Sequence, residues 1–178
     1  MAWRLKCEEC ALLVVDMQEK LLPAIHGAES VARNVLVLTQ AFALFRRPLV
    51  FTEQYPQGLG HTVPELLRGA EQTSPTIVEK TRFNAAGAVA GFRSKNIVVC
   101  GVETHVCVRQ TALELLAQGK VVTVVADATG SRREEHRRVA LEELRARGAV
   151  IVSAESLLFD WLEDSRHPLF KSIARLIK

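Results

Sequence analysis

This chain of 178 residues contains no apolar run close to the roughly 18 residues that a membrane-spanning helix requires. Its N-terminus, from Met1 to Lys6, holds no signal-peptide core ahead of Glu8 and Glu9. The formal net charge is only +3, and the densest basic stretch, residues 132–138, carries both signs. Such a balance offers no broad surface of one sign to nucleic acid or to a membrane. We therefore expect a cytoplasmic protein that binds neither of them.

The chain also lacks the glycine-rich turns that bind phosphate groups. Its first apolar run, residues 11–16, continues into Met17, Gln18 and Glu19 without a glycine. A dinucleotide site needs glycines at that point so that the backbone can approach the pyrophosphate closely, and a P-loop needs its own glycine pattern. We therefore predict no nucleotide cofactor, and we expect the protein to work without any cofactor.

Cysteine is scarce, with four in the whole chain, and in the cytoplasm these thiols are expected to be reduced. Cys7 and Cys10 have the spacing of a redox motif, but they precede the first predicted strand. A thioredoxin-like motif follows a strand and opens a helix, so we interpret this pair as incidental. A zinc site would need two further ligands at matching spacing, and the sequence does not offer them. We predict no metal.

Short apolar runs and helical patterns alternate along the chain. The runs predict buried strands at residues 11–16, 48–52, 76–79, 96–101, 121–125 and 149–152. Helical spacing predicts helices at residues 30–45, 85–91, 103–118, 132–147, 154–161 and 168–177. Continuous apolar strands between helices are typical of a parallel sheet that is covered on both faces. We predict one α/β domain over residues 1–178, with three α/β/α layers of Rossmann-like type, and a long irregular segment at 53–74.

Three chemically reactive side chains lie at the ends of predicted strands. Asp16 ends the first strand, Lys80 follows the third, and Cys107 lies just past the fourth, on the first turn of the next helix. In an open parallel sheet, ligands bind beyond the carboxyl ends of the strands. Each residue also has an ordinary interpretation: Asp16 as a helix N-cap, Lys80 as a solvated strand end and Cys107 as a small buried hydrophobe. Their convergence at one edge of the sheet nevertheless favours an active site.

The position of Cys107 also leads to an expectation about its charge. A thiol on the first turn of a helix meets the positive end of the helix dipole and unpaired backbone N–H groups. Both favour the thiolate, which is the nucleophilic form. We therefore expect an activated cysteine. His105 lies two residues earlier and points roughly 200° away on a helix, so we expect a capping or surface role for it and no Cys–His dyad.

Segments 12–18, 79–85 and 101–108, which contain Asp16, Lys80 and Cys107, resemble the isochorismatase-like cysteine hydrolase family. This family includes nicotinamidase and N-carbamoylsarcosine amidohydrolase. The resemblance runs from about residue 12 to about residue 156, and residues 166–171 also look like the tail of isochorismatase-domain proteins. Three motifs in the right order make the resemblance specific.

The resemblance implies a six-stranded parallel sheet of order 3-2-1-4-5-6 and a triad of Cys107, Asp16 and Lys80. In the family the aspartate is the general base, the lysine supports it electrostatically, and the cysteine attacks a carbonyl carbon. It further implies a cis peptide bond at Val102–Glu103 and an oxyanion hole formed by the N–H groups of Glu103 and Cys107.

The implied function is hydrolysis of a C–N bond in a small amide-like substrate through a covalent thioester. Two alternatives remain open: a vinyl ether hydrolase of the isochorismatase type, and a non-catalytic binding or scaffold protein on the same fold. The family usually assembles, so we expect a homo-oligomer. The last predicted helix carries an apolar stripe that fits either its own sheet or a partner.

The sequence departs from the nicotinamidase pattern after the second predicted strand. Nicotinamidases carry an Asp-x-His metal site there, whereas this chain has residues 52–55 without either ligand and only His61 nearby. This departure agrees with the expectation of no metal. The side chains that flank the three motifs are the candidates for lining a substrate pocket; they are Gln18, Gln54, Tyr55 and Phe83.

Overall fold

The computed structural model describes residues 5–178. Residues 1–4, which belong to the N-terminal segment considered for a signal peptide, lie outside the described residues. A six-stranded sheet of order β3-β2-β1-β4-β5-β6 forms the centre, and every neighbouring pair of strands is parallel. This confirms the predicted fold class and strand order. The strands are β1 (Cys10–Val15), β2 (Leu49–Gln54), β3 (Thr76–Lys80), β4 (Asn96–Val102), β5 (Val121–Gly130) and β6 (Val150–Val152).

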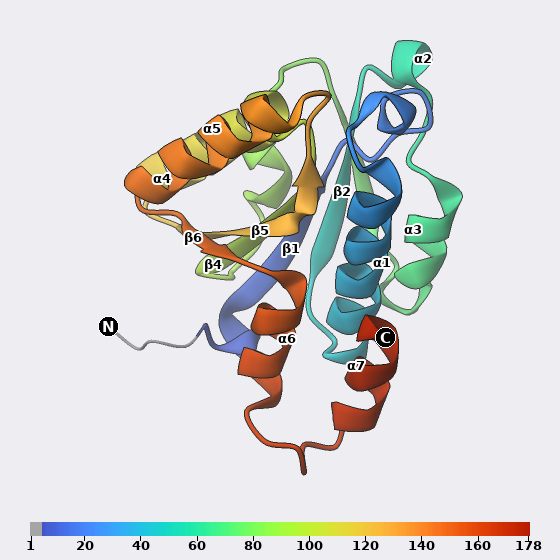
Figure 1. The fold of residues 1–178 in the computed structure, drawn as a ribbon, viewed down its shortest axis with the longest axis vertical. Coiled ribbons are helices and arrows are strands. Elements are labelled where there is room, and N and C mark those ends of the chain that lie inside the picture. The colour runs from blue at the N-terminus through green and yellow to red at the C-terminus, as the bar shows by residue number, and fades with distance from the viewer. Residues whose placement is uncertain (1–4) are drawn as a thin grey trace.

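Helices cover both faces of this sheet, as Figure 1 shows. The α-helices are α1 (Ala28–Leu44), α2 (Pro56–Leu59), α3 (Pro64–Gly69), α4 (Arg109–Ala117), α5 (Glu134–Ala146), α6 (Ala154–Leu162) and α7 (Phe170–Ile177). Helices α1, α6 and α7 pack on one face, and α4 and α5 pack on the other. Within residues 5–178, no helix is both long and apolar enough to cross a membrane.

The central strands explain why the sheet forms. Every residue of β1 and β4 is buried. Alternate side chains of β1 enter different cores: Leu12 and Val14 pack toward α1, whereas Leu13 and Val15 pack with Cys107 toward α4. Full burial of one such side chain stabilises the fold by roughly 1.5–3 kcal/mol. Two-sided burial of this kind fixes where each strand ends, and therefore where the polar residue after it lies.

Two predicted segments differ from the structure. The segment 53–74, predicted to be irregular, contains the end of β2, the short helices α2 and α3, and a 3-10 turn at Glu71–Thr73. Pro56 and Pro64 stand at the starts of α2 and α3, where a missing N–H costs nothing. The helix predicted at 85–91 is only a 3-10 turn, Ala86–Val89. Glycines within and after it disfavour a longer helix.

The apolar stripe of the last helix packs against the protein's own core. In α7, Ile173 is fully buried, and the flanking apolar side chains pack against the same cluster as α1 and α6. Phe170 meets Phe159 of α6 edge to face, with ring centroids 6.3 Å apart. The stripe is therefore used within the chain.

Gly101 is required where β4 passes β1. Its φ is +106°, and a Cβ there would lie 2.1 Å from the Val15 carbonyl oxygen and 2.7 Å from the Val15 nitrogen. Backbone atoms cannot move aside as a flexible side chain can. We expect Gly101→Ala to lower the free energy of unfolding by roughly 3 kcal/mol or more, measured by chemical denaturation. Gly91→Ala, where a Cβ meets nothing within 4 Å, is the matched control and should change stability little.

Candidate active site

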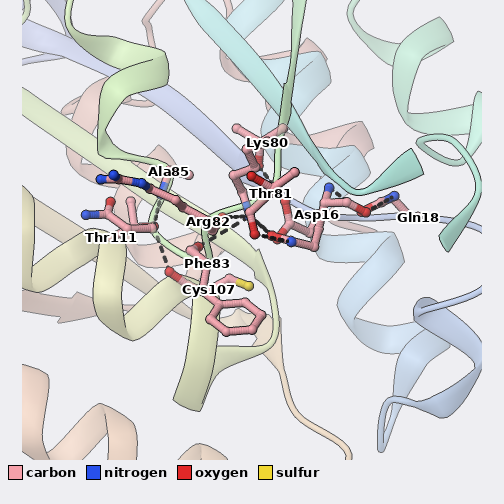
Figure 2. A network of polar contacts seen from close by, with 12 residues as sticks. Asp16, Gln18, Lys80, Thr81, Arg82, Phe83, Ala85, Cys107 and Thr111 are labelled. Carbon is pink, nitrogen blue, oxygen red and sulfur yellow. Dashed lines mark hydrogen bonds and ion pairs between the residues drawn. The ribbon is translucent and has the colours of Figure 1, made fainter. Parts of the chain in front are cut away.

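The structure brings Asp16, Lys80 and Cys107 together at the carboxyl end of the sheet. Asp16 directly follows β1, and Lys80 is the last residue of β3. Cys107 follows β4, in a π-helical turn, Thr104–Val108, that precedes α4. The predicted helix at 103–118 therefore begins as a π turn. Figure 2 shows the side chains of Lys80 and Asp16 turned toward one another.

Asp16 is fully buried, and both of its carboxylate oxygens accept hydrogen bonds. The hydroxyl of Thr52 donates to Oδ1 at 2.7 Å, and the ammonium of Lys80 donates to Oδ2 at 2.7 Å. Burial raises the pKa of Asp16 above its ordinary 3.8, although Lys80, Thr52 and a hydrogen bond with Cys107 act in the opposite direction. The residue is thus a base whose proton affinity exceeds that of a surface aspartate, and it is no helix N-cap.

Lys80 is held by four acceptors rather than by solvent. Its side chain is only 9% exposed, and besides Asp16 its ammonium donates to Oε1 of Gln54 at 2.8 Å. The carbonyl oxygens of Arg82 and Phe83 each lie 3.3 Å away. These contacts fix the positive charge beside Asp16, so Lys80 is not a solvated strand end.

Cys107 is 6% exposed, and the pKa of its thiol is raised to about 12. Burial is the largest cause and the negative charge of Asp16 the next, while Lys80 and a hydrogen bond from the Glu103 backbone lower it. The pKa of the thiol is thus shifted in the direction opposite to the one expected from the helix terminus alone. A helix terminus contributes about 1 kcal/mol, which is less than the cost of an anion buried beside a carboxylate. Cys107 therefore needs a base to remove its proton, and Asp16 is the carboxylate whose charge acts on the thiol.

The side chain of Glu103 is held away from the thiol. Its carboxylate accepts hydrogen bonds from the backbone N–H of Arg132 at 3.0 Å and from Nε of the same residue at 3.1 Å. The peptide bond between Val102 and Glu103 is cis. Any contribution of Glu103 to the site is therefore made by its backbone.

The four predicted pocket residues have different environments. Gln18 is fully buried and pairs with the backbone of Gln54, donating to its carbonyl at 3.0 Å and accepting from its N–H at 2.8 Å. In the view of Figure 2 it lies on the far side of Asp16 from Cys107. We predicted that Gln18 would line the substrate pocket; its side chain is buried inside the protein, where it binds backbone groups. Gln54 itself binds Lys80 and donates to the carbonyl of Thr81 at 2.7 Å.

Tyr55 and Phe83 are the two exposed members of the set, at 55% and 52%. Tyr55 lines a hollow of about 340 Å³ that also reaches Lys80. Phe83 lines a neighbouring hollow of about 600 Å³ between the 81–87 segment and α4. Both aromatic residues therefore lie at the outer surface, on hollows beside the 81–87 segment and Lys80.

The histidines nearest the site are turned to other partners. The Nδ1 of His105 lies 3.0 Å from the Ser131 hydroxyl, and its ring packs 4.8 Å from that of His136, as expected for a histidine that forms no dyad with the cysteine. His61 pairs with Glu53 at 3.0 Å. Over residues 5–178, no group of three or more His, Cys, Asp and Glu side chains is placed to hold a metal ion.

Two threonines that the sequence analysis missed complete the site. Thr52 binds Asp16, as described above. Thr111 donates to the carbonyl of Cys107 at 2.6 Å and accepts the N–H of Ala85 at 2.8 Å, so it ties the 81–86 segment to the turn that carries the thiol. For Thr52 a signal was present, because it is a polar residue at the end of an apolar strand, as Asp16 is.

The chain is similar in sequence and in fold to several known proteins. The isochorismatase domain model matches residues 10–156. Isochorismatase domain-containing protein 2 of Bos taurus is 43% identical over 172 residues, which is 94% of this chain and 82% of that protein. The MAR1 ribonuclease structure from Caenorhabditis elegans has a TM-score of 0.92 at 35% identity, covering 98% of this chain and 92% of that one. The YcaC gene product of Escherichia coli, described as an octameric hydrolase of unknown specificity, has a TM-score of 0.90 at 28% identity, covering 99% and 90%.

Proposed function

The chain belongs to the isochorismatase domain family, and on that premise we propose that it is a cysteine hydrolase that cleaves a C–N bond of a small amide-like substrate. The observation that carries the proposal is the buried carboxylate of Asp16, which accepts a hydrogen bond from Lys80 at 2.7 Å and whose negative charge acts on the Cys107 thiol. A nucleophile, a base and a group that fixes the base are the elements of covalent hydrolysis.

In the first half of the proposed reaction, Asp16 takes the proton of the Cys107 thiol as the sulfur attacks the carbonyl carbon. A C–S bond forms, and the carbonyl oxygen becomes an oxyanion, for which the N–H groups of Glu103 and Cys107 are the proposed donors. Collapse of this intermediate breaks the C–N bond. The amine leaves with the proton from Asp16, and a thioester remains on Cys107.

In the second half, water hydrolyses the thioester. Asp16, again a carboxylate, accepts a proton from the water as its oxygen attacks the acyl carbon. The C–S bond breaks, the acid is released, and the proton returns to the sulfur to restore the thiol. Whenever Asp16 is ionised, the ammonium of Lys80 beside it compensates its negative charge.

Two other functions are distinguishable by experiment. A vinyl ether hydrolase would protonate a carbon of the substrate and would release a ketone, whereas a scaffold protein would turn over nothing. A panel of small amides, carbamoyl compounds and vinyl ethers, assayed with the purified protein, separates these three possibilities. The carboxylate of Asp16 is held by Thr52 and Lys80 beside the Cys107 thiol. This arrangement favours the amide reaction, because it gives the nucleophile a base.

The names of three structural relatives, from Caenorhabditis elegans and two Leishmania species, raise ribonuclease activity as a further candidate. Incubation of the protein with single-stranded and double-stranded RNA tests it directly. We expect no cleavage, because the proposed nucleophile is a nearly buried thiol and His105, the nearest histidine in sequence, is engaged with Ser131. RNA cleavage that survives Cys107→Ser would point to a different site from the one proposed here.

Alkylation by iodoacetamide tests the activated thiol without a known substrate. Cys7 is more exposed than Cys107, and burial raises the pKa of both thiols to about 12. Accessibility alone therefore predicts faster reaction at Cys7, whereas a general base at Asp16 predicts faster reaction at Cys107. We expect Cys107 to be alkylated at least about ten times faster near pH 7, as measured by peptide mass spectrometry. Equal or slower reaction at Cys107 would count against the proposed mechanism.

We also propose that the protein is a homo-oligomer whose contact surface includes the exposed aromatic residues beside the site. The support is the octameric relative, and Tyr55 and Phe83 are large exposed side chains that such a contact would cover. Light scattering at micromolar concentration should give a multiple of the 19.7 kDa chain mass. A monomer mass would refute the assembly and leave the proposed chemistry unaffected.

A further inference from the structure

We propose that Thr52 and Gln54, two side chains of β2, are positioning residues that hold the carboxylate of Asp16 and the ammonium of Lys80 in place for proton transfer from Cys107. This inference rests on the proposed function and extends it to the strand that lies between β1 and β3. It gives Gln54 a role inside the site instead of one in substrate binding.

The register of the sheet places both side chains beside the triad. Thr52 is paired with Val15, the residue before Asp16, and Gln54 is paired with Lys80. Alternate residues of a strand share a face. Val50, two residues before Thr52, packs in the same core cluster as Cys107. Thr52 and Gln54 therefore project on the face of the sheet that carries the thiol.

Their contacts define the orientation of the ion pair. Thr52 is 1% exposed, and its hydroxyl donates to the oxygen of Asp16 that Lys80 does not bind. Gln54 accepts from the Lys80 ammonium at 2.8 Å, and its own amide donates to Thr81, which anchors it. Gln18 holds the Gln54 backbone from the other side. Thr52 and Lys80 each bind one oxygen of the Asp16 carboxylate, so the carboxylate cannot rotate without breaking one of these two hydrogen bonds.

This arrangement makes the proton affinity of Asp16 depend on Thr52. The titratable groups that face Asp16 are Lys80 from β3 and Cys107 from the π turn, and Thr52 is the uncharged donor from β2. A donor to the carboxylate favours its ionised form, so removal of the hydroxyl should raise the pKa of Asp16 further. The protein would then need a higher pH before Asp16 can accept the proton of the thiol.

The test is the pH dependence of Cys107 alkylation by iodoacetamide between pH 4 and 9, followed by peptide mass spectrometry. The rate should fall at acidic pH, where Asp16 becomes protonated. In Thr52→Val, which keeps the shape of the side chain, we expect this acidic limb of the profile to move to higher pH by about one unit. At pH values below the limb, the alkylation rate should fall roughly tenfold. Thr52→Ser keeps the hydroxyl, so its acidic limb should lie at the same pH as that of the unmodified protein. Thr39→Val removes a buried hydroxyl that binds only a backbone carbonyl within α1 and serves as the control for a general effect on the fold.

Gln54 provides an independent variant in case Thr52→Val does not fold. Gln54→Met removes one of the four acceptors for Lys80 and should lower the alkylation rate at acidic pH roughly threefold. Gln54→Glu keeps an oxygen at that position and should lose less. An acidic limb that is unchanged in Thr52→Val and in Gln54→Met would overturn the positioning role. The proposed function fails separately, if Cys107 in the unmodified protein reacts no faster than Cys7.

Discussion

The Cys107→Ser protein should fold like the unmodified protein and lose turnover by a factor on the order of 10³ or more. A hydroxyl occupies the space of the thiol, which is 6% exposed, so packing changes little. Its proton is much harder to remove than that of a thiol, even one whose pKa is raised to about 12, and Asp16 is not a strong enough base to remove it. The measurement is the rate on whichever small amide the substrate panel identifies, with circular dichroism to verify the fold.

Cys7→Ser is the matched control, since Cys7 lies in a 3-10 turn before β1 and makes no contact with the triad. It should retain full turnover. If Cys107→Ser kept more than about a tenth of the activity, the sulfur would not be the nucleophile, and the covalent mechanism would have to be abandoned.

Asp16→Asn should lower kcat by roughly 10²- to 10⁴-fold, the usual contribution of a general base. The amide keeps an acceptor for Thr52 but cannot take the proton from Cys107. It also leaves the ammonium of Lys80, whose side chain is 9% exposed, without its carboxylate, so some loss of stability is expected as well. Thermal unfolding measured beside the kinetics separates the two effects, and the kinetics are read at a temperature where both proteins are folded.

The pH profile provides a second check on Asp16. Since burial raises the pKa of this carboxyl above 3.8, the acidic limb of kcat/KM should lie above the range of an ordinary aspartate, and activity should fall as pH drops through it. Asp127→Asn, which alters a carboxylate of β5 that caps α6 through the N–H of Ala154, should leave that limb in place. If Asp16→Asn kept both its kcat and the acidic limb of kcat/KM, the group that titrates in this limb would not be Asp16.

The strands were accessible from the sequence for a physical reason, whereas their order was expected only from the resemblance to a known family. A strand buried on both faces must be apolar throughout, and β1 and β4 are buried at every position, so each run and its polar end are visible as local patterns. Asp16 and Cys107 were found because each follows such a run. The weaker signals failed where local preference is ambiguous: the segment 85–91 has helical spacing, but its glycines leave only a 3-10 turn.

Side-chain direction at the strand ends was beyond the sequence. Gln18 is polar and close to Asp16, yet it turns inward to hold the backbone of Gln54. Thr52 looked like the last residue of a strand and proved to be a hydrogen-bond donor to Asp16. Whether a polar residue at such a point faces a pocket, a neighbour or solvent depends on the register between strands, which a single strand does not encode.

The sequence by itself determined the α/β architecture and the identity of the three reactive side chains, because burial and periodicity are local properties of the chain. Only the tertiary structure decided their chemical state. The thiol of Cys107 is expected to be an anion when its own helix alone is considered, but burial and a carboxylate from the end of β1 raise its pKa to about 12. That carboxylate is in turn held by Thr52, 36 residues away, and by Lys80, 64 residues away. Proton affinity is set by charges and desolvation at close range in space, and folding alone brings these distant residues into range.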